Sequence, residues 1–124
     1  MGSPFTQYKK SVAKTASYAV KPTDHDYRFS NYGAAGAVTF TLPAIADVFD
    51  GWSIEFVVLA NQTVTVTAPS GKLIAGNNTG ATSIAFSSTS EKVGNTIGIY
   101  YDGNAAKYVA QLNLGTETHT PTIS

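Results

Sequence analysis

The residues best suited to chemistry in this chain are its two histidines, His25 and His119. His25 lies between Asp24 and Asp26, and an imidazole flanked by carboxylates could orient a metal ion or act as a general base. An Asp-His-Asp turn is more often a solvated surface group, and His119 lies in a polar tail. The sequence therefore predicts no metal site and no cofactor.

Glycoside cleavage is a second chemistry to consider, because it needs a pair of carboxylates that flank the bond. Glu55 stands in a strand otherwise rich in apolar residues, and a buried glutamate is a candidate site residue. It alternates with Ile54 and Phe56, so it most simply faces solvent or a neighbouring subunit. We therefore expect no catalytic residue and no enzyme. A carbohydrate-binding module or glycan-active enzyme that uses Glu55 and the tyrosines is the alternative from another class.

Binding of nucleotides or nucleic acid finds little support in the sequence. Residues 71–80 contain glycines but no Gly-Lys-Ser/Thr loop between an apolar strand and a helix. The seven tyrosines could stack on sugars or bases, but most occupy alternating strand positions that a core would use, and few basic residues accompany them. We expect no nucleic-acid partner and no small-molecule substrate.

The composition limits the functions that the chain can have. Its 124 residues suffice for one domain with a core of its own, and the absence of cysteine excludes disulfide frameworks and thiolate metal sites. The formal net charge is zero, so no general attraction to nucleic acid or to an anionic membrane is expected. No apolar run approaches the roughly 20 residues that span a bilayer. We expect a soluble product of the cytoplasm.

The elements that must position these residues are short β-strands joined by turns rich in Gly, Asn and Pro. Residues 38–42 alternate apolar and polar side chains, as a half-buried strand requires. Residues 52–58 and 64–66 predict a hairpin, and the Asp-Gly-Asn turn at 102–104 predicts another. The fold expected is all-β: a small antiparallel sandwich or jelly-roll of about eight strands, spanning residues 16–115.

Two features of the central segment carry further predictions. Val57 and Leu59 make the second face of the strand at 52–59 apolar as well, so this strand should be central in its sheet or covered on both sides. Residues 43–50 predict at most one helical turn, which ends at a glycine. Its Ile45 and Phe49 are expected to plug an open end of the sandwich.

The ends of the chain are predicted to lie outside the sandwich. Residues 1–15 show no sustained period and carry lysines with no nearby acid, which indicates an extended arm. Residues 116–124 form a polar tail, disordered or extended along a partner. The arm is either a frayed terminus or an extension that docks on a partner, with these contact residues: Phe5, Tyr8, Lys9, Lys10 and Lys14.

A family resemblance adds to these inferences. Residues 17–74 contain a polar turn with Asp24, an aromatic strand, Asn-x-Gly-Ala at 31–34, Val-Thr-Phe-x-Leu-Pro at 38–43, and a small-residue corner that ends in Gly51. An aromatic Phe-Val strand, a Val-Thr-Val return and the hairpin at 94–103 complete the pattern. It is similar to a module of tailed-phage virion proteins, including head decoration proteins, tail fibres and tailspikes. The resemblance covers roughly residues 16–112, and the corner departs from it by inserting bulkier residues such as Phe49.

The resemblance implies a structural protein of the virion. Such modules associate as trimers, and Glu55, Val57 and Leu59 are the residues expected at the subunit interface. A chain with its own Met and a basic start suits a capsid decoration, or cement, protein on the outer surface of the phage head. The partner implied is the major capsid protein, which the arm would contact. The main alternative is a tail-fibre, baseplate or host-receptor module that binds glycan through the loop at 68–83.

Overall fold

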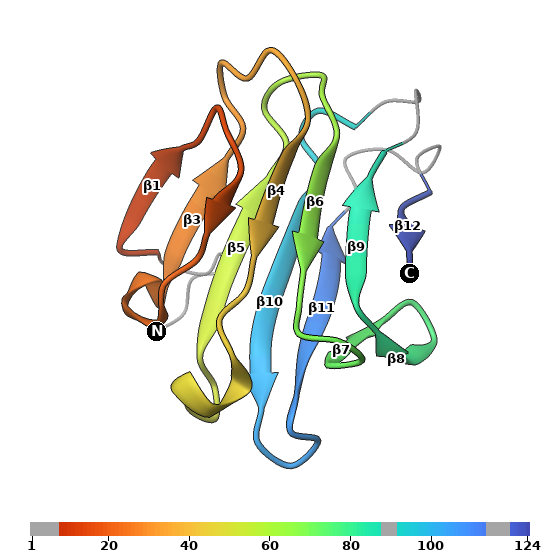
Figure 1. The fold of residues 1–124 in the computed structure, drawn as a ribbon. Helices are drawn as coiled ribbons and strands as arrows, with labels where there is room; N and C mark the ends of the chain where they lie inside the picture. The colour runs from red at the N-terminus through yellow and green to blue at the C-terminus, as the bar shows by residue number, and fades with distance from the viewer. Residues whose placement is uncertain (1–7, 88–91, 114–119) are drawn as a thin grey trace.

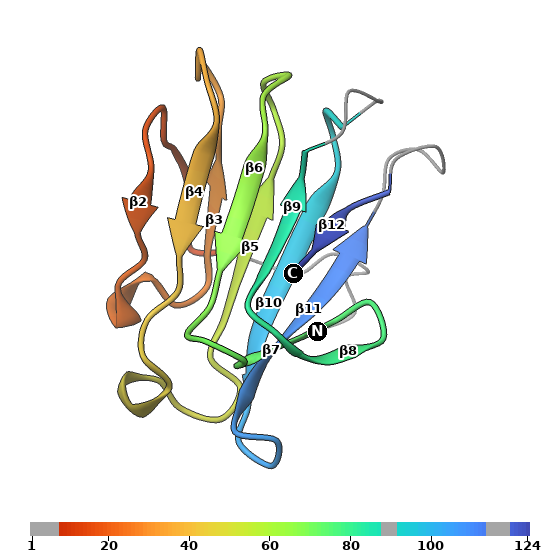
Figure 2. The same ribbon diagram turned by 45° about the vertical axis from the view of Figure 1, so that its right-hand side comes forward.

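The chain folds into two β-sheets that pack face to face (Figures 1 and 2), in a computed structural model that describes residues 8–87, 92–113 and 120–124. This confirms the all-β sandwich expected from the sequence. The larger sheet has the strand order β1-β3-β5-β10-β11-β7-β8 and consists of Lys10–Ala13 (β1), Tyr27–Ser30 (β3), Ser53–Val57 (β5), Thr96–Asp102 (β10), Lys107–Asn113 (β11), Leu73–Ala75 (β7) and Asn78–Ala81 (β8). The smaller sheet has the order β12-β9-β6-β4-β2 and consists of Thr122–Ile123 (β12), Ser83–Phe86 (β9), Val64–Thr67 (β6), Val38–Thr41 (β4) and Tyr18–Ala19 (β2).

The first six strands alternate between the two sheets (Figure 2), with β1, β3 and β5 in the larger and β2, β4 and β6 in the smaller. Each connection therefore forms an arch that passes from one sheet to the other. Strands two apart in sequence then become parallel neighbours in the same sheet. Four of the ten strand pairings are parallel for this reason, and a fifth parallel pair, β11 with β7, joins two later strands. The prediction of an antiparallel sandwich was wrong in this respect, and the described strands number twelve rather than about eight.

The predicted hairpin between residues 52–58 and 64–66 was also wrong. β5 pairs with β3 and β10, whereas β6 pairs with β4 and β9 in the other sheet. A hairpin and an arch both place one apolar face of each strand on the core, so the alternation of side chains does not distinguish them. The prediction that β5 is central in its sheet is confirmed, since it has a neighbour on each side.

The second predicted hairpin is confirmed. β10 and β11 pair antiparallel from Thr96↔Asn113 to Asp102↔Lys107. At the turn, the Asp102 carboxylate accepts hydrogen bonds from the backbone N–H groups of Asn104 and Ala105, at 2.8 and 3.2 Å. A short polar side chain that bonds backbone groups just after itself is the usual way for aspartate to stabilise a turn.

The core lies between the sheets and is aromatic at its centre. Phe40 from β4 packs against Phe29 from β3 and Phe56 from β5, with ring centroids 5.8 and 4.8 Å apart. All three side chains are at most 1% exposed. Burying side chains of this size contributes roughly 1.5–3 kcal/mol each to folding, so this trio joins the two sheets.

The corner after β4 contains one short 3-10 helix, Ile45–Asp47. Another short 3-10 helix, Pro22–Asp24, lies elsewhere in the chain, before β3. The prediction of at most one helical turn in the corner is thus confirmed. Ile45 packs against the core, but Phe49 is 54% exposed, so the prediction that both plug the sandwich was wrong for Phe49. Within the described residues no helix is long enough and apolar enough to cross a membrane.

Parts of both predicted terminal extensions belong to the sheets. We expected residues 1–15 to form an arm, but residues 10–13 form β1, which pairs in parallel with β3 at the edge of the larger sheet. We expected residues 116–124 to form a tail, but residues 122–123 form β12, which covers the edge of β9. Ser124 N donates to Ser83 O at 3.0 Å and completes this contact.

Candidate functional site

A buried asparagine organises one end of the sandwich. Asn31 follows β3 and is fully buried. The side-chain carbonyl oxygen of Asn31 accepts hydrogen bonds from the backbone N–H groups of Leu59 and Ala60, at 2.7 and 2.9 Å. Its amide group donates to the carbonyl of Ala60 at 3.0 Å. One side chain thereby ties the loop after β3 to the loop after β5.

The loop before β10 joins the same end. Gly94 N donates to Val58 O at 2.7 Å, and Val58 N donates to Asn95 O at 3.0 Å. Three loops from distant parts of the sequence are therefore held together by hydrogen bonds. We call the surface formed by these loops the exposed end, because it carries three large apolar side chains that face solvent: Tyr32, Leu59 and Val93, which are 67%, 45% and 53% exposed.

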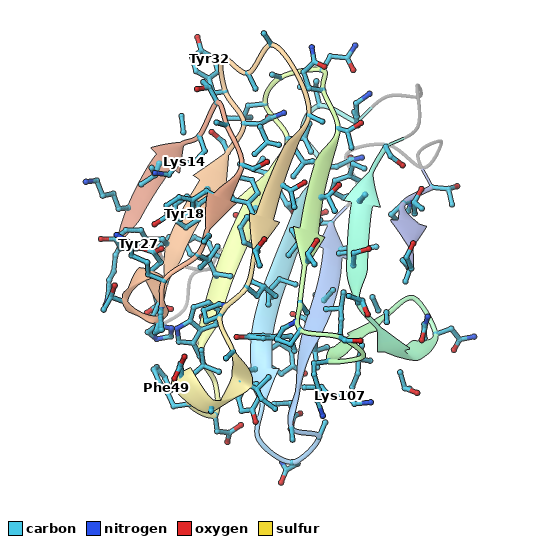
Figure 3. The ribbon with its side chains drawn as sticks, viewed as in Figure 1. Lys14, Tyr18, Tyr27, Tyr32, Phe49 and Lys107 are labelled. Atoms are coloured by element: carbon cyan, nitrogen blue, oxygen red, sulfur yellow. The ribbon has the colours of Figure 1, made fainter. Side chains whose placement is uncertain are left out.

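The opposite end of the sandwich, where Phe49 lies in Figure 3, is closed by buried aromatic residues. Trp52 is fully buried and its indole N–H donates to Pro22 O at 2.8 Å. Tyr108 is also fully buried and its hydroxyl donates to Pro43 O at 2.8 Å. Their rings meet edge to face, with centroids 5.9 Å apart. We call this cluster the packed end.

Burial changes the acidity of Tyr108. Removing its phenol from water disfavours the phenolate, and the nearby Tyr101 and Asp47 add to the effect, so its pKa is raised well above the ordinary value. Tyr18 is affected for similar reasons: burial and the hydrogen bond that it donates to Asp24 at 2.8 Å raise its pKa to about 12. Both phenols act as hydrogen-bond donors that stabilise the fold.

The Asp-His-Asp turn is part of the frame near the packed end. His25 Nδ1 accepts a hydrogen bond from Ser53 N at 3.0 Å, and its Nε2 lies 3.3 Å from Asp26 Oδ2. The His25 ring packs edge to face on Phe49 with 4.9 Å between centroids. No group of three or more side chains that could hold a metal ion occurs within residues 8–87, 92–113 and 120–124. His119 falls outside these residues.

The outward side of the larger sheet, which we call the outer face, carries Glu55. Its carboxylate forms an ion pair with the Arg28 guanidinium on the adjacent strand, and the side chains are 15% and 41% exposed. The Tyr8 ring covers Arg28, with its centroid 4.8 Å from the guanidinium carbon. Glu55 is therefore held by charge and hydrogen bonding within its own sheet. Its proposed role at a subunit interface stays a prediction.

A shallow hollow lies beside this ion pair. It has a volume of about 120 Å³. Gly98 forms part of its lining from the middle of β10, between Glu55 on β5 and Gln111 on β11. The hollow contains hydroxyl, phenol and amide groups around that glycine, and these residues line it: Tyr8, Ser53, Ile54, Gly98, Ile99, Tyr100 and Gln111.

The other residues predicted to contact partners are dispersed. Lys9 and Lys10 are exposed at the β1 edge, and Lys9 N donates to Asp26 O at 2.8 Å. Lys14 Nζ lies 4.0 Å from the centroid of the Tyr18 ring (both labelled in Figure 3). Val57 is half-buried on the outer face, whereas Leu59 belongs to the exposed end. Phe5 lies outside the described residues. The structure thus places Tyr8 over Arg28, the ion-pair partner of Glu55. Leu59 lies apart from these residues, at the exposed end.

Several residues that shape these surfaces were not identified from the sequence. The Asn-x-Gly-Ala stretch at 31–34 does not predict that the Asn31 side chain is buried and bonds the loop after β5. The sequence pattern does not single out Gly98, although a glycine inside a strand can mark a bulge, a tight bend or close approach by a ligand or another backbone. The sequence pattern does not single out Arg28, because its ion-pair partner Glu55 is 27 residues away in sequence.

Comparison with known proteins adds no family assignment. No protein-family model matches the chain, and no curated protein sequence matches it.

Proposed function

We propose that this chain is a structural protein of a tailed-phage virion, a capsid decoration protein that binds the outer capsid surface as a trimer and stabilises the head. The resemblance of residues 16–112 to virion modules motivates the proposal. The observation that carries it is the exposed end, where three of the four exposed large apolar side chains in the described residues are gathered. A cluster of this kind on a small domain is a typical mark of a surface that binds another protein.

The exposed end suits a permanent contact because its loops are already fixed. Asn31 bonds both Leu59 and Ala60, and Gly94 bonds Val58, so little backbone freedom is lost when a partner covers these loops. Fixing a loop before binding reduces the entropic cost of association. We assign this end, which includes Leu59, to contacts between the copies of a trimer.

The β1 edge is assigned to the major capsid protein. Tyr8, Lys9 and Lys10 lie at or before an edge strand, and Lys14 lies just after it. Lysines on an edge strand discourage pairing between identical sheets. They also suit an acidic partner surface, which would be the capsid. Burial at each contact is small, but its sum over many copies opposes the internal pressure of the packaged genome.

The proposal is tested by adding the purified chain to phage particles that lack it. Particles without the chain are expected to lose their genome at a lower temperature or on treatment with a chelator, and added chain is expected to restore resistance. Particle stability that does not depend on the chain would contradict the proposal.

The trimer contact is tested with the double variant Tyr32→Ser and Leu59→Ser. Sedimentation is expected to show a trimer for the native chain and a monomer for this variant, while the unfolding free energy changes by less than about 0.5 kcal/mol for each exposed site. The matched control is Phe49→Ser at the packed end, which should leave the trimer intact. A native chain that sediments as a 13.0 kDa monomer at high concentration would disprove the assignment.

A further inference from the structure

We infer that the hollow beside Gly98 on the outer face binds one ring of a neutral oligosaccharide. The hollow does not include the exposed end, and the inference does not rest on the proposed function, although Tyr8 belongs both to the lining of the hollow and to the residues assigned to the capsid contact.

The first step concerns the glycine itself. Gly98 stands in the middle of β10, with a neighbouring strand on each side. A Cβ atom added at this position would meet nothing closer than the carbonyl oxygen of Gln111 at 3.7 Å, an ordinary contact, and its backbone is not left-handed. The fold therefore has room for a side chain here. Glycine weakens a strand interior, so its presence is explained by the space that it leaves above the sheet.

The second step concerns the groups around that space. Tyr8 and Tyr100 supply two aromatic rings, and Ser53 and Gln111 supply a hydroxyl and a carboxamide. Aromatic rings pack against the C–H face of a pyranose. The Gln111 carboxamide can both donate and accept hydrogen bonds, and the Ser53 hydroxyl, which donates to Asp26 at 2.9 Å, can still accept one from a sugar hydroxyl. This combination fits a hydroxylated ring better than it fits an apolar ligand.

The third step concerns charge. Three charged side chains lie close to the hollow. Arg28 and Glu55 form an ion pair with each other, and Tyr8 lies over the guanidinium. The Asp26 carboxylate accepts a hydrogen bond from the hydroxyl of Ser53, a lining residue, at 2.9 Å. The charges of Arg28 and Glu55 balance each other, and the Asp26 carboxylate adds a negative charge, so the surroundings of the hollow do not attract anions. A neutral ligand is therefore favoured over a phosphate, a carboxylate or a nucleic-acid backbone.

The fourth step concerns size. The volume of about 120 Å³ is well below that of a pocket that encloses a drug-sized molecule. The hollow can accept one sugar ring, and the neighbouring rings of the chain would extend over the sheet. An open site of this kind gives weak binding, with a dissociation constant on the order of 1 mM.

The inference is tested by titrating the ¹⁵N-labelled full chain with four neutral trisaccharides: maltotriose, cellotriose, mannotriose and chitotriose. At least one is expected to shift the backbone amide signals of Ser53, Gly98 and Gln111 in a saturable manner. Amide signals on the smaller sheet should stay in place. If none of the four shifts these signals at concentrations about tenfold above the expected dissociation constant, the inference is overturned.

The decisive variant is Gly98→Val, which fills the hollow with a side chain that suits a strand. It is expected to raise the melting temperature slightly and to weaken sugar binding at least tenfold. Thr65→Val on the outward side of β6 is the matched control and should leave binding unchanged. Equal binding by Gly98→Val would overturn the inference. If this variant fails to fold, Gln111→Ala at an exposed position serves instead. Unchanged sugar binding by Gln111→Ala would also overturn the inference.

Two further measurements are needed. One distinguishes an insoluble glycan from a soluble sugar as the ligand, and the other tests whether a second copy of the chain occupies the hollow. Retention on insoluble cellulose, chitin or starch, compared with binding of the free trisaccharides, distinguishes a glycan surface from a soluble sugar. If Gly98→Val changes only the sedimentation of the chain and the native chain shows no sugar shifts, the hollow holds another copy and the inference fails. Loss of sugar binding in Gly98→Val with normal attachment to phage particles would leave the proposed function intact.

Discussion

The two ends of the sandwich are closed in different ways. At the packed end, Trp52 and Tyr108 bury their rings completely and donate hydrogen bonds to Pro22 O and Pro43 O. At the exposed end, the buried Asn31 side chain and the backbone hydrogen bonds of Val58 with Gly94 and Asn95 hold the loops, and the large apolar side chains around them face water. Figure 3 places Tyr32 and Phe49, one exposed residue from each end, at opposite extremes of the molecule.

This difference shows how the molecule separates stability from association. Buried aromatic area stabilises the fold of one chain in isolation, because apolar surface has already left water. Apolar side chains that stay in water contribute to stability only when a partner covers them. The packed end is therefore expected to determine the unfolding free energy, and the exposed end to determine the oligomeric state.

The largest effect on stability is expected from Trp52→Ala. This change removes a fully buried ring and the hydrogen bond to Pro22 O, and replacements of this type cost about 3–5 kcal/mol. Urea denaturation followed by far-ultraviolet circular dichroism measures the loss. Phe49→Ala at the same end is the control, since that side chain is 54% exposed and its removal should cost little. Equal losses in the two variants would refute the distinction between buried and exposed aromatic residues here.

An intermediate effect is expected from Asn31→Ala at the exposed end. The backbone N–H groups of Leu59 and Ala60 lose their acceptor, and a polar group left without a partner costs about 1–3 kcal/mol. Asn31→Asp retains the acceptor oxygen but loses the hydrogen bond donated to Ala60 O and buries a charge, so it is also expected to lose stability. We also expect Asn31→Ala to weaken trimer formation, because its loops are released. If denaturation midpoints show a loss as large as that of Trp52→Ala, the two ends contribute equally and the contrast fails.

The smallest effect at neutral pH is a loss of stability that begins only in alkaline solution and comes from the partly buried Tyr18 and the buried Tyr108. Tyr18 has a pKa of about 12 in the folded chain and 10.0 in the reference state. The folded chain therefore retains its proton more tightly, and this contribution is complete below pH 10 and is lost as the pH rises through 12. Tyr108, with its raised pKa, should act in the same direction.

Unfolding free energies measured from pH 8 to pH 12 test this prediction. The native curve is expected to be flat up to about pH 10 and then to fall. Tyr108→Phe should start from a lower stability, because it loses the hydrogen bond to Pro43 O, and should fall less steeply above pH 10. An alkaline loss of the same steepness in this variant would show that Tyr108 contributes nothing to it.

The sequence alone determined the class of the fold, because alternating side chains are a local property. The alternation of residues 38–42 and the Asp-Gly-Asn turn at 102–104 predicted strands and a hairpin that the structure contains. The placement of Ile54 and Phe56 on the core face followed from the same two-residue period. Composition likewise limited the chemistry, since a chain without cysteine has no thiolate to offer.

The tertiary structure alone decided which strands are neighbours and which side chains meet. The loop between β5 and β6 passes from one sheet to the other at the exposed end, and no local pattern distinguishes such an arch from a hairpin. The pairs Arg28–Glu55 and Asn31–Leu59 connect residues 27 and 28 positions apart. Their contacts depend on sheet pairing, which is a property of the whole chain. For the same reason, Gly98 became a candidate binding site only when the neighbouring strands placed Ser53 and Gln111 beside it.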